Sequence, residues 1–293
     1  MEIYVEQYLQ YLQNERKTAF NTVEAYGHDL RKMCHYLNEH GVTGIHQVTF
    51  TDLNSYLLTL EKKGCASSTV SRNVSTMKSF FLYLYRQKIT YRDPSEKLKA
   101  PKIIKKVPEI LSVEEMDCLL SCPETDTVKG IRDKAMLELL YATGMKVTEV
   151  ISLKTEDVNM ALKVINLHDE ERERIVPFGE PAKKALSNYI ENARPVISAG
   201  DTDIFFLNMN GKAMSRQGFW KIIKYYGACA GFEERLTPHT FRHSFAAHMV
   251  ENGADLKSLQ EMLGHADIST TQIYSGFTNT GVGAAFLKAH PRK

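Results

Sequence analysis

Apolar residues recur every three or four positions through the first 90 residues of the chain, which is the spacing of one face of an α-helix. Four such stripes are separated by short polar segments, and no stretch between them alternates convincingly as a strand does. Ser67, Ser68 and Thr69 stand where the last stripe begins and could cap its first turn. The pattern predicts a bundle of four helices, near 5–12, 22–37, 50–60 and 67–84.

A different composition marks residues 91–108. Three prolines and five lysines fall between positions 92 and 108, with little apolar periodicity. Proline blocks a continuing helix and biases the residue before it toward extended backbone. We therefore expect an extended linker here, whose lysines could also follow the phosphate groups of a nucleic acid.

Beyond the linker the periodicity is mixed. Ser112 and Glu115 have the spacing of a capping box, so a helix is expected to begin there. Alternating segments at 163–168 and 172–177 flank an acidic turn and predict a β-hairpin. The other elements expected are a helix over 132–141 that ends at Thr143-Gly144, a strand over 204–207, and helices over 215–229, 239–251, 256–263 and 269–277.

These patterns predict a mainly α-helical protein with a small β-hairpin or sheet. Residues 1–90 are expected to form a helical domain, 91–108 the linker and 109–293 a mixed α/β domain. Residues 1–107 carry 16 Lys and Arg against 10 Asp and Glu, whereas the rest of the chain carries 21 against 25. A basic first domain suggests a polyanionic partner, although a solvated surface of this charge is also ordinary.

Composition narrows the class of protein further. Hydrophobic residues make up 43% and charged residues 25%, which are globular values and exclude disorder as the main state. No apolar run approaches the roughly 18 residues of a membrane span. The first residues lack the basic start and apolar core of a secretory signal, so we expect a cytoplasmic protein.

Cysteine usage agrees with a reducing compartment. The five cysteines are odd in number and irregularly spaced, which argues against a disulfide framework. Cys118 and Cys122 could share a helix face, but two sulfur ligands do not make a structural zinc site.

The densest group of chemically active side chains lies between Thr237 and His243. His239 and Arg242 are three positions apart and share a helix face. His239 and His243 also have the spacing of zinc ligands, with His248 as a possible third, but the glutamate of a His-Glu-x-x-His site is missing. Packed or surface positions are the ordinary interpretation of His243 and His248.

Three motifs follow one another near the end of the chain: His239-x-x-Arg242, Leu263-Gly264-His265 and Thr270-Thr-Gln-Ile-Tyr274. Their order and spacing resemble the tyrosine site-specific recombinases of the phage-integrase family, most closely the bacterial Xer subfamily of chromosome-dimer resolvases. The resemblance extends over nearly the whole chain. Residues 21–30 and 68–84 resemble helices of that family's SAM-like core-binding domain, 132–144 the opening of its catalytic domain, and 289–292 its tail.

The resemblance implies site-specific DNA recombination, with Tyr274 as the nucleophile. Its attack on a phosphodiester would form a 3′-phosphotyrosyl bond and free a 5′-hydroxyl, and this ester keeps the bond energy, so that neither ATP nor a metal or other cofactor is needed. A phenol is a weak nucleophile, and the transition state gains negative charge, so cationic donors must surround the phosphate. Arg242 would supply a bidentate fork, and His239 and His265 further donors and proton transfer.

Two positions depart from the family pattern. The family has an arginine where this chain has Lys146, and a lysine keeps the charge but loses the planar fork. The family also has a lysine in the hairpin turn that protonates the leaving oxygen, and alignment from 173–177 places Asp169 there. A shifted register could bring Lys163 or Arg172 into that role.

Further expectations concern partners. Arg31, Lys32, Arg72 and Lys78 lie on the predicted helices of the first domain and could contact DNA, or could be ordinary solvated charges. The family implies a clamp on double-stranded DNA and a homo- or hetero-tetramer, in which the C-terminal tail is exchanged and a second recombinase can take part. Because Lys146 and Asp169 depart from the pattern, a catalytically weakened or silent architectural DNA-binding protein of the bacterial nucleoid is the alternative.

Overall fold

The structure is a computed structural model that describes residues 1–102, 108–168, 173–198, 200–264 and 289–292. The chain divides into two compact units, Met1–Lys106 and Val107–Lys293. Each unit has its own hydrophobic core, and each is described by itself. Among the described residues, no helix has both the length and the apolar character needed to cross a membrane.

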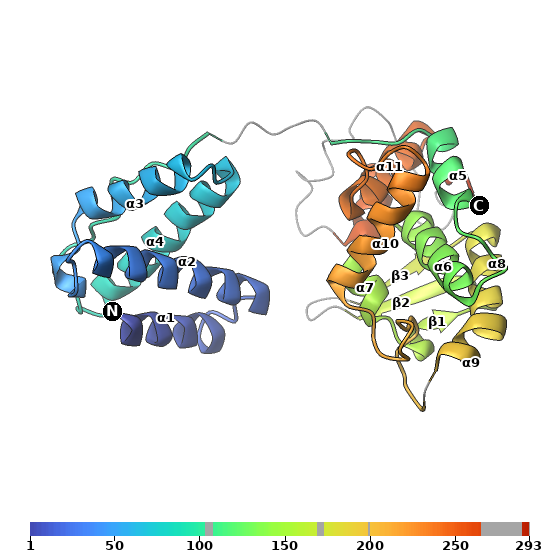
Figure 1. Cartoon of the computed structure of the whole chain (residues 1–293), viewed down its shortest axis with the longest axis horizontal. Helices are drawn as coiled ribbons and strands as arrows, with labels where there is room; N and C mark the ends of the chain where they lie inside the picture. The colour runs from blue at the N-terminus through green and yellow to red at the C-terminus, as the bar shows by residue number, and fades with distance from the viewer. Residues whose placement is uncertain (103–107, 169–172, 199, 265–288, 293) are drawn as a thin grey trace. The chain divides into compact units, whose positions relative to one another are not determined.

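The described part of the first unit is helical, as the sequence predicts. It contains α1 (Glu2–Asn14), α2 (Phe20–Glu39), the short 3₁₀ turn η1 (Ile45–Gln47), α3 (Phe50–Lys62) and α4 (Ser67–Arg86) (Figure 1). The aromatic side chains Tyr8, Phe80 and Phe81 are fully buried and form the centre of the core. The cap predicted for α4 is wrong, because Ala66 is its N-cap and no side chain there bonds the first turn.

The second unit places a small antiparallel sheet among helices. Its strands are β1 (Val158–Asn159), β2 (Val164–His168) and β3 (Glu173–Pro177), in the order β1-β2-β3. The predicted hairpin is confirmed, with His168 paired to Glu173 at its closed end. The helices are α5 (Val113–Ser121), α6 (Val128–Thr143), α7 (Val147–Ser152), the 3₁₀ turn η2 (Thr155–Asp157), α8 (Glu180–Asn188), the π-helical turn η3 (Tyr189–Ala193), α9 (Arg194–Ile197), α10 (Arg216–Cys229), α11 (Pro238–Glu251) and α12 (Leu256–Leu263).

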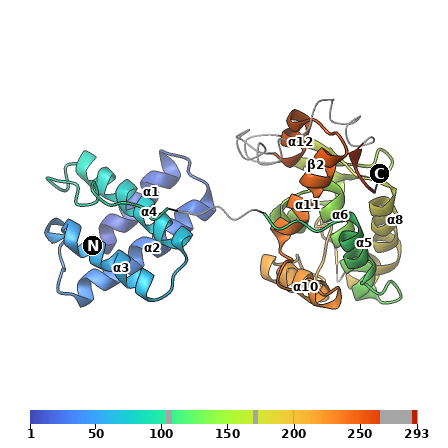
Figure 2. The ribbon, with the colours of Figure 1, turned by 90° about the horizontal axis from the view of Figure 1, so that it is seen from above.

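Helix α6 is the central element of this unit. It is buried on nearly every side and contacts α8, α11 and α5, whose arrangement Figure 2 shows from above. A buried carboxylate, Asp133, joins it to α10, because it accepts hydrogen bonds from Arg132 and from the Tyr226 hydroxyl. Buried charges are tolerated when they are paired in this way.

Two parts of this unit differ from the sequence prediction. The segment 204–207 is not a strand in the described structure and takes part only in isolated bridges. Its donors bond to irregular backbone and to a side chain: the amide of Phe205 to the carbonyl of Leu153, and the amide of Leu207 to the Tyr189 hydroxyl. The helices between Glu180 and Ile197 were not predicted, and the helix predicted over 269–277 lies outside the described residues.

Residues 289–292 pack on their own domain. Ala289 and His290 are buried, and Arg292 forms ion pairs with Glu138 at 2.8 Å and Asp117 at 2.9 Å. Burial lowers the pKa of His290 to about 4, so this imidazole is neutral at pH 7. These four residues therefore have a defined place on the second unit of the single chain.

Candidate active site

The turn between α6 and α7 positions the first candidate residue. Gly144 ends α6 with a φ of 61°, in the left-handed region, and a Cβ atom there would lie 2.4 Å from the ring of Phe245. Only glycine fits both constraints. Two residues later, Lys146 is the N-cap of α7, where its backbone amide donates to Oε2 of Glu149 at 2.7 Å. The side chain of Lys146 is thereby held at the start of α7, partly exposed.

Arg242 fixes this turn from the other side. It lies in the second turn of α11, which begins at Pro238 with Thr237 as cap. Arg242 as a whole is 8% exposed, and its guanidinium donates to the carbonyl of Gly144 at 2.8 Å and to the carbonyl of Leu263. The structure thus brings Arg242 to the turn that carries Lys146.

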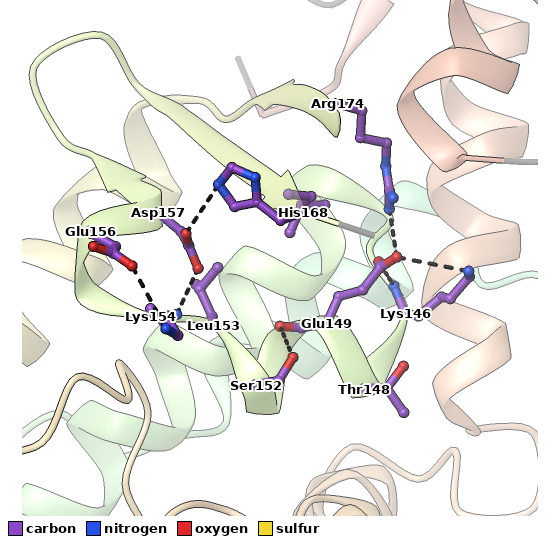
Figure 3. A pocket seen from close by; sticks show the side chains of 11 residues that line it. Lys146, Thr148, Glu149, Ser152, Leu153, Lys154, Glu156, Asp157, His168 and Arg174 are labelled. Atoms are coloured by element: carbon purple, nitrogen blue, oxygen red, sulfur yellow. Dashed lines mark hydrogen bonds and ion pairs between the residues drawn. The ribbon is translucent and has the colours of Figure 1, made fainter. Parts of the chain in front are cut away.

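Glu149 and Arg174 form an ion pair next to the α6–α7 turn. Nη2 of Arg174 donates to Oε1 of Glu149 at 2.7 Å (Figure 3), and Nε donates to the carbonyl of Met262 at 3.1 Å. The same carboxylate oxygen of Glu149 lies 3.9 Å from Nζ of Lys146. A Cβ atom at Gly264 would lie 2.9 Å from the Arg174 guanidinium. Arg174 therefore joins β3 to α7 and to the end of α12.

Sequence reasoning did not identify Arg174 as a site residue. It lies in the segment 173–177, which served only to align the hairpin. The available signal was its place as the second residue of the predicted second strand, where a long cationic side chain stands close to the hairpin turn. Its partners Glu149 and Met262 come from distant parts of the chain and could not be identified from the sequence.

The histidines of α11 occupy different environments. His239 is exposed at the start of the helix, and the centre of its ring lies 6.2 Å from that of His243. Burial, together with the charges of His239 and Arg242, lowers the pKa of His243. His248 is buried, and its Nδ1 lies 2.8 Å from the Tyr141 hydroxyl. His239 therefore faces solvent, whereas His248 belongs to the core.

A cleft of about 480 Å³ opens beside these residues, within the size range of ligand sites. It contains Lys146, Glu149 and Arg174 together with His168, the last residue of β2 (Figure 3). The remaining lining residues are Thr148, Ser152, Leu153, Lys154, Glu156, Asp157 and Leu167. The alternative lysine of the hairpin, Lys163, is not among them, because it lies before β2 and pairs with Glu180 of α8.

Three candidate residues lie outside the described part of the chain: Asp169, His265 and Tyr274. Arg172, the other alternative for the hairpin lysine, is also outside it. The described chain reaches Gly264, which ends α12 with a φ of 64°. His265 thus follows directly on a residue in contact with Arg174.

The cations predicted to contact DNA in the first unit have different partners. Arg31 forms an exposed ion pair with Glu6 at 2.7 Å. Arg72 donates two hydrogen bonds to the buried carboxylate of Asp29, at 2.8 and 3.0 Å, so its first role is to hold α4 against α2. Lys32 is exposed and Lys78 half-buried.

A further basic surface was missed by the sequence analysis. Helix α10 contains Arg216, Lys221 and Lys224 and no acidic residue, and it packs against α7. Trp220 and Tyr225 are partly exposed on the same helix. The charge of this helix could have been read from the sequence. It was overlooked because the second domain as a whole has more acidic than basic residues.

The family of the chain follows from comparison with known proteins. Residues 109–279 match the phage integrase family, and residues 5–88 match the N-terminal SAM-like domain of phage integrases. The chain therefore belongs to the phage integrase family, and the resemblance to tyrosine recombinases is confirmed.

Individual relatives agree with this assignment. The chain is 42% identical over 294 residues to the tyrosine recombinase XerD of Staphylococcus epidermidis and of Staphylococcus aureus strain N315, and each alignment covers 100% of both chains. Among solved structures, it resembles the XerH recombinase bound to its difH substrate, with a TM-score of 0.72 and 20% identity over 92% of this chain and 81% of that one. A lambda integrase dimer bound to a core site gives a TM-score of 0.72 with 14% identity, over 96% and 98%. At these identities the structures support the fold.

Replacing Arg174 with methionine is expected to destabilise the second unit by about 2–4 kcal/mol, since the largely buried Glu149 carboxylate and the Met262 carbonyl would lose their donor. Denaturant unfolding followed by the fluorescence of Trp220, the one tryptophan of the chain, measures this.

Lys163→Met is the matched control, because it removes an exposed ion pair with Glu180 and should cost less than about 1 kcal/mol. Equal losses in the two variants would contradict a bridging role for Arg174.

Proposed function

We propose that this chain is a Xer-type DNA strand transferase that carries out site-specific recombination through Tyr274. The main observation behind the proposal is a pair of cations at the α6–α7 turn, which we call the phosphate cradle. Arg242 donates a hydrogen bond to the carbonyl of Gly144, and Lys146 follows Gly144 two residues later. Family membership over the full length and 42% identity to recombinases disfavour the alternative of a silent architectural protein.

The chemistry follows from charge. A phosphodiester under attack by a phenol gains negative charge on its non-bridging oxygens, and preorganised cations stabilise that charge best. Lys146, Arg242 and the exposed His239 supply donors from two adjoining helices. Glu149 keeps Lys146 at the turn through its backbone amide. His265 would add a donor beside Gly264.

The proposed intermediate joins Tyr274 to the 3′-phosphate of the cut strand. The phosphotyrosyl ester preserves the energy of the broken bond, so that a 5′-hydroxyl can reverse the step on the same or another strand. The described side chains offer positive donors for this chemistry, and the proposal requires neither a nucleotide nor a metal ion.

DNA binding would use both units. The first unit presents Lys32, Lys78 and the outer edge of Arg72, and residues 1–107 carry a surplus of basic residues. Helix α10 adds a basic face next to α7. Such cations contact phosphates and position a protein on the duplex without reading its sequence.

We also infer the assembly from the family. The solved relatives include XerH bound to its difH substrate and a lambda integrase dimer bound to a core site. By analogy, the chain would act on double-stranded DNA as a homo- or hetero-tetramer, with a second recombinase as a possible partner and the C-terminal tail exchanged between protomers. A bacterial cytoplasm, with association to the nucleoid, is the setting that fits this role.

Covalent capture tests the proposed nucleophile. Incubation with a nicked suicide duplex that carries a Xer-type site should give a denaturation-resistant protein–DNA band, because loss of the short fragment prevents rejoining. Tyr274→Phe, which removes only the hydroxyl, should abolish the band while gel-shift binding persists. Specific binding by the unaltered protein without any band would instead identify a silent DNA-binding protein.

Lys146 should limit the rate of cleavage. Lys146→Arg is expected to speed covalent capture by about 10-fold, since it adds one charge-assisted hydrogen bond to the transition state. Lys146→Met should slow it by about 10²–10³-fold. Capture rates on the suicide duplex measure both variants, and combining Lys146→Arg with Asp169→Lys should give the largest gain. Failure of the arginine variants to exceed the unaltered protein on any substrate would refute this interpretation of position 146.

Tail exchange predicts a role in cooperativity. Deleting residues 286–293 should weaken cooperative DNA binding in gel shifts on a two-site duplex. Because Ala289 and His290 are buried in the single chain, a thermal melt must show that the truncated protein remains folded. A folded truncation with unchanged cooperativity would argue against exchange.

A further inference from the structure

The cleft beside Lys146 contains one imidazole among its described lining residues, that of His168. Its place is set by the hairpin register, since His168 and Glu173 are the last paired residues before the turn. The ring lies between two carboxylates. Nε2 is 3.6 Å from Oδ1 of Asp157, and Nδ1 is 3.3 Å from Oε1 of Glu173 (Figure 3 shows the first of these).

The two carboxylates differ in how firmly they are held. The Asp157 side chain is 12% exposed, and its Oδ2 accepts a hydrogen bond from the backbone amide of Lys154 at 2.9 Å. The Glu173 side chain is 82% exposed. Asp157 therefore lies within ion-pair distance of Nε2 and is itself held in place, while Glu173, which is hydrogen-bonded to Nδ1, is exposed and can turn into water to uncover that nitrogen. A carboxylate behind one nitrogen and an accessible second nitrogen is the arrangement that suits histidine for proton transfer.

The proposed reaction needs a proton donor on the leaving-group side. An alkoxide is a poor leaving group unless a proton reaches the oxygen as its bond to phosphorus breaks. The other described cations of the cleft are unsuited to this. Arg174 is fixed between two acceptors, and a guanidinium does not release its proton. Lys154 pairs with Asp203 and Glu156, and Lys146 belongs to the phosphate cradle.

We propose that His168 is the general acid of strand cleavage in this protein, an inference that rests on the proposed function. Oη of Tyr274 bonds to phosphorus and passes its own proton to a neutral imidazole on the nucleophile side, for which the exposed His239 is the described candidate. The bond between phosphorus and the 5′-oxygen breaks, and the imidazolium proton of His168 passes to that oxygen. The products are a 5′-hydroxyl and a neutral imidazole, which takes the proton back when the hydroxyl attacks in rejoining.

This assignment is specific to the present sequence. The family pattern places a lysine in the hairpin turn, whereas the turn here reads Asp169-Glu-Glu-Arg172 and contains no lysine. Acidic residues near a phosphate repel it and cannot act as a cationic acid. His168 directly precedes the turn, so an acid at this position needs no shift in the hairpin register.

A change of leaving group tests the proposal. Two suicide duplexes are compared, one with an ordinary phosphodiester and one in which sulfur replaces the 5′-bridging oxygen at the cleavage position. A thiolate leaves without protonation because its conjugate acid is far stronger than an alcohol, with a pKa of about 8.5 in cysteine. The sulfur substrate therefore bypasses a missing general acid but still requires the nucleophile and the cationic cradle.

His168→Gln should slow capture on the oxygen substrate by about 10²–10⁴-fold. On the sulfur substrate its rate should stay within about threefold of the unaltered protein, which also shows that the variant is folded and binds DNA. His168→Lys, which restores a donor, should recover part of the loss. His46→Gln, an exposed histidine of the first unit, is the control and should match the unaltered protein on both duplexes.

Equal losses for His168→Gln on both substrates would overturn the proposal, as would an unimpaired rate on the oxygen substrate. Cleavage of only the sulfur substrate by the unaltered protein would also overturn it, because Tyr274 would then work without any effective acid. Cleavage of neither substrate, despite specific binding, would instead refute the proposed function itself.

Discussion

The guanidinium of Arg242 holds together the ends of two helices on which the site depends. Its donors meet the carbonyls of Gly144, which ends α6, and of Leu263, at the end of α12. The last carbonyls of a helix lack partners within it and carry the negative end of its dipole, so two such ends repel unless a cation lies between them. Both helices end in a left-handed glycine, which opens the carbonyls toward the arginine. The fold therefore places a buried cation beside the cleft for structural reasons, and the chemistry can use it.

A single carboxylate organises the cations around this clamp. Glu149 accepts from the backbone of Lys146 and from Arg174, and it lies between their side chains. Without it, the side chains of Lys146 and Arg174 would face each other in a partly buried space, at a cost that grows as the dielectric falls. The same carboxylate limits Lys146, because an ammonium drawn toward Glu149 offers a phosphate a point charge and no planar fork. A lysine in place of the family's arginine at position 146 therefore weakens the binding of a phosphate but keeps a positive charge there.

The sequence predicted the parts that depend on periodicity and short motifs. The four helices of the first unit, the hairpin and the helix carrying Arg242 are local patterns and were predicted correctly. The site was predicted only as far as family motifs extend, and Arg174 was missed because its partners lie 25 and 88 residues away. The segment 204–207 was misjudged because its backbone amides bond to the carbonyl of Leu153 and to the Tyr189 hydroxyl rather than to a neighbouring strand, and a buried apolar run does not show where its backbone donors go. Local patterns thus define the scaffold, and long-range hydrogen bonds define the site.

Charges of both signs line the cleft. Glu149 lies between Lys146 and Arg174, whereas Asp157 and Glu173 flank His168 at the end of the hairpin, with Lys154 next to Asp157. A phosphodiester entering such a site turns its charged oxygens toward the cations and keeps them away from the carboxylates. In the proposed reaction, that orientation would leave a bridging oxygen directed toward the hairpin, where His168 supplies the one imidazole among the described lining residues of the cleft. The acidic hairpin, which looks unfavourable for binding a phosphate, thereby acquires a function in orienting the bond that breaks.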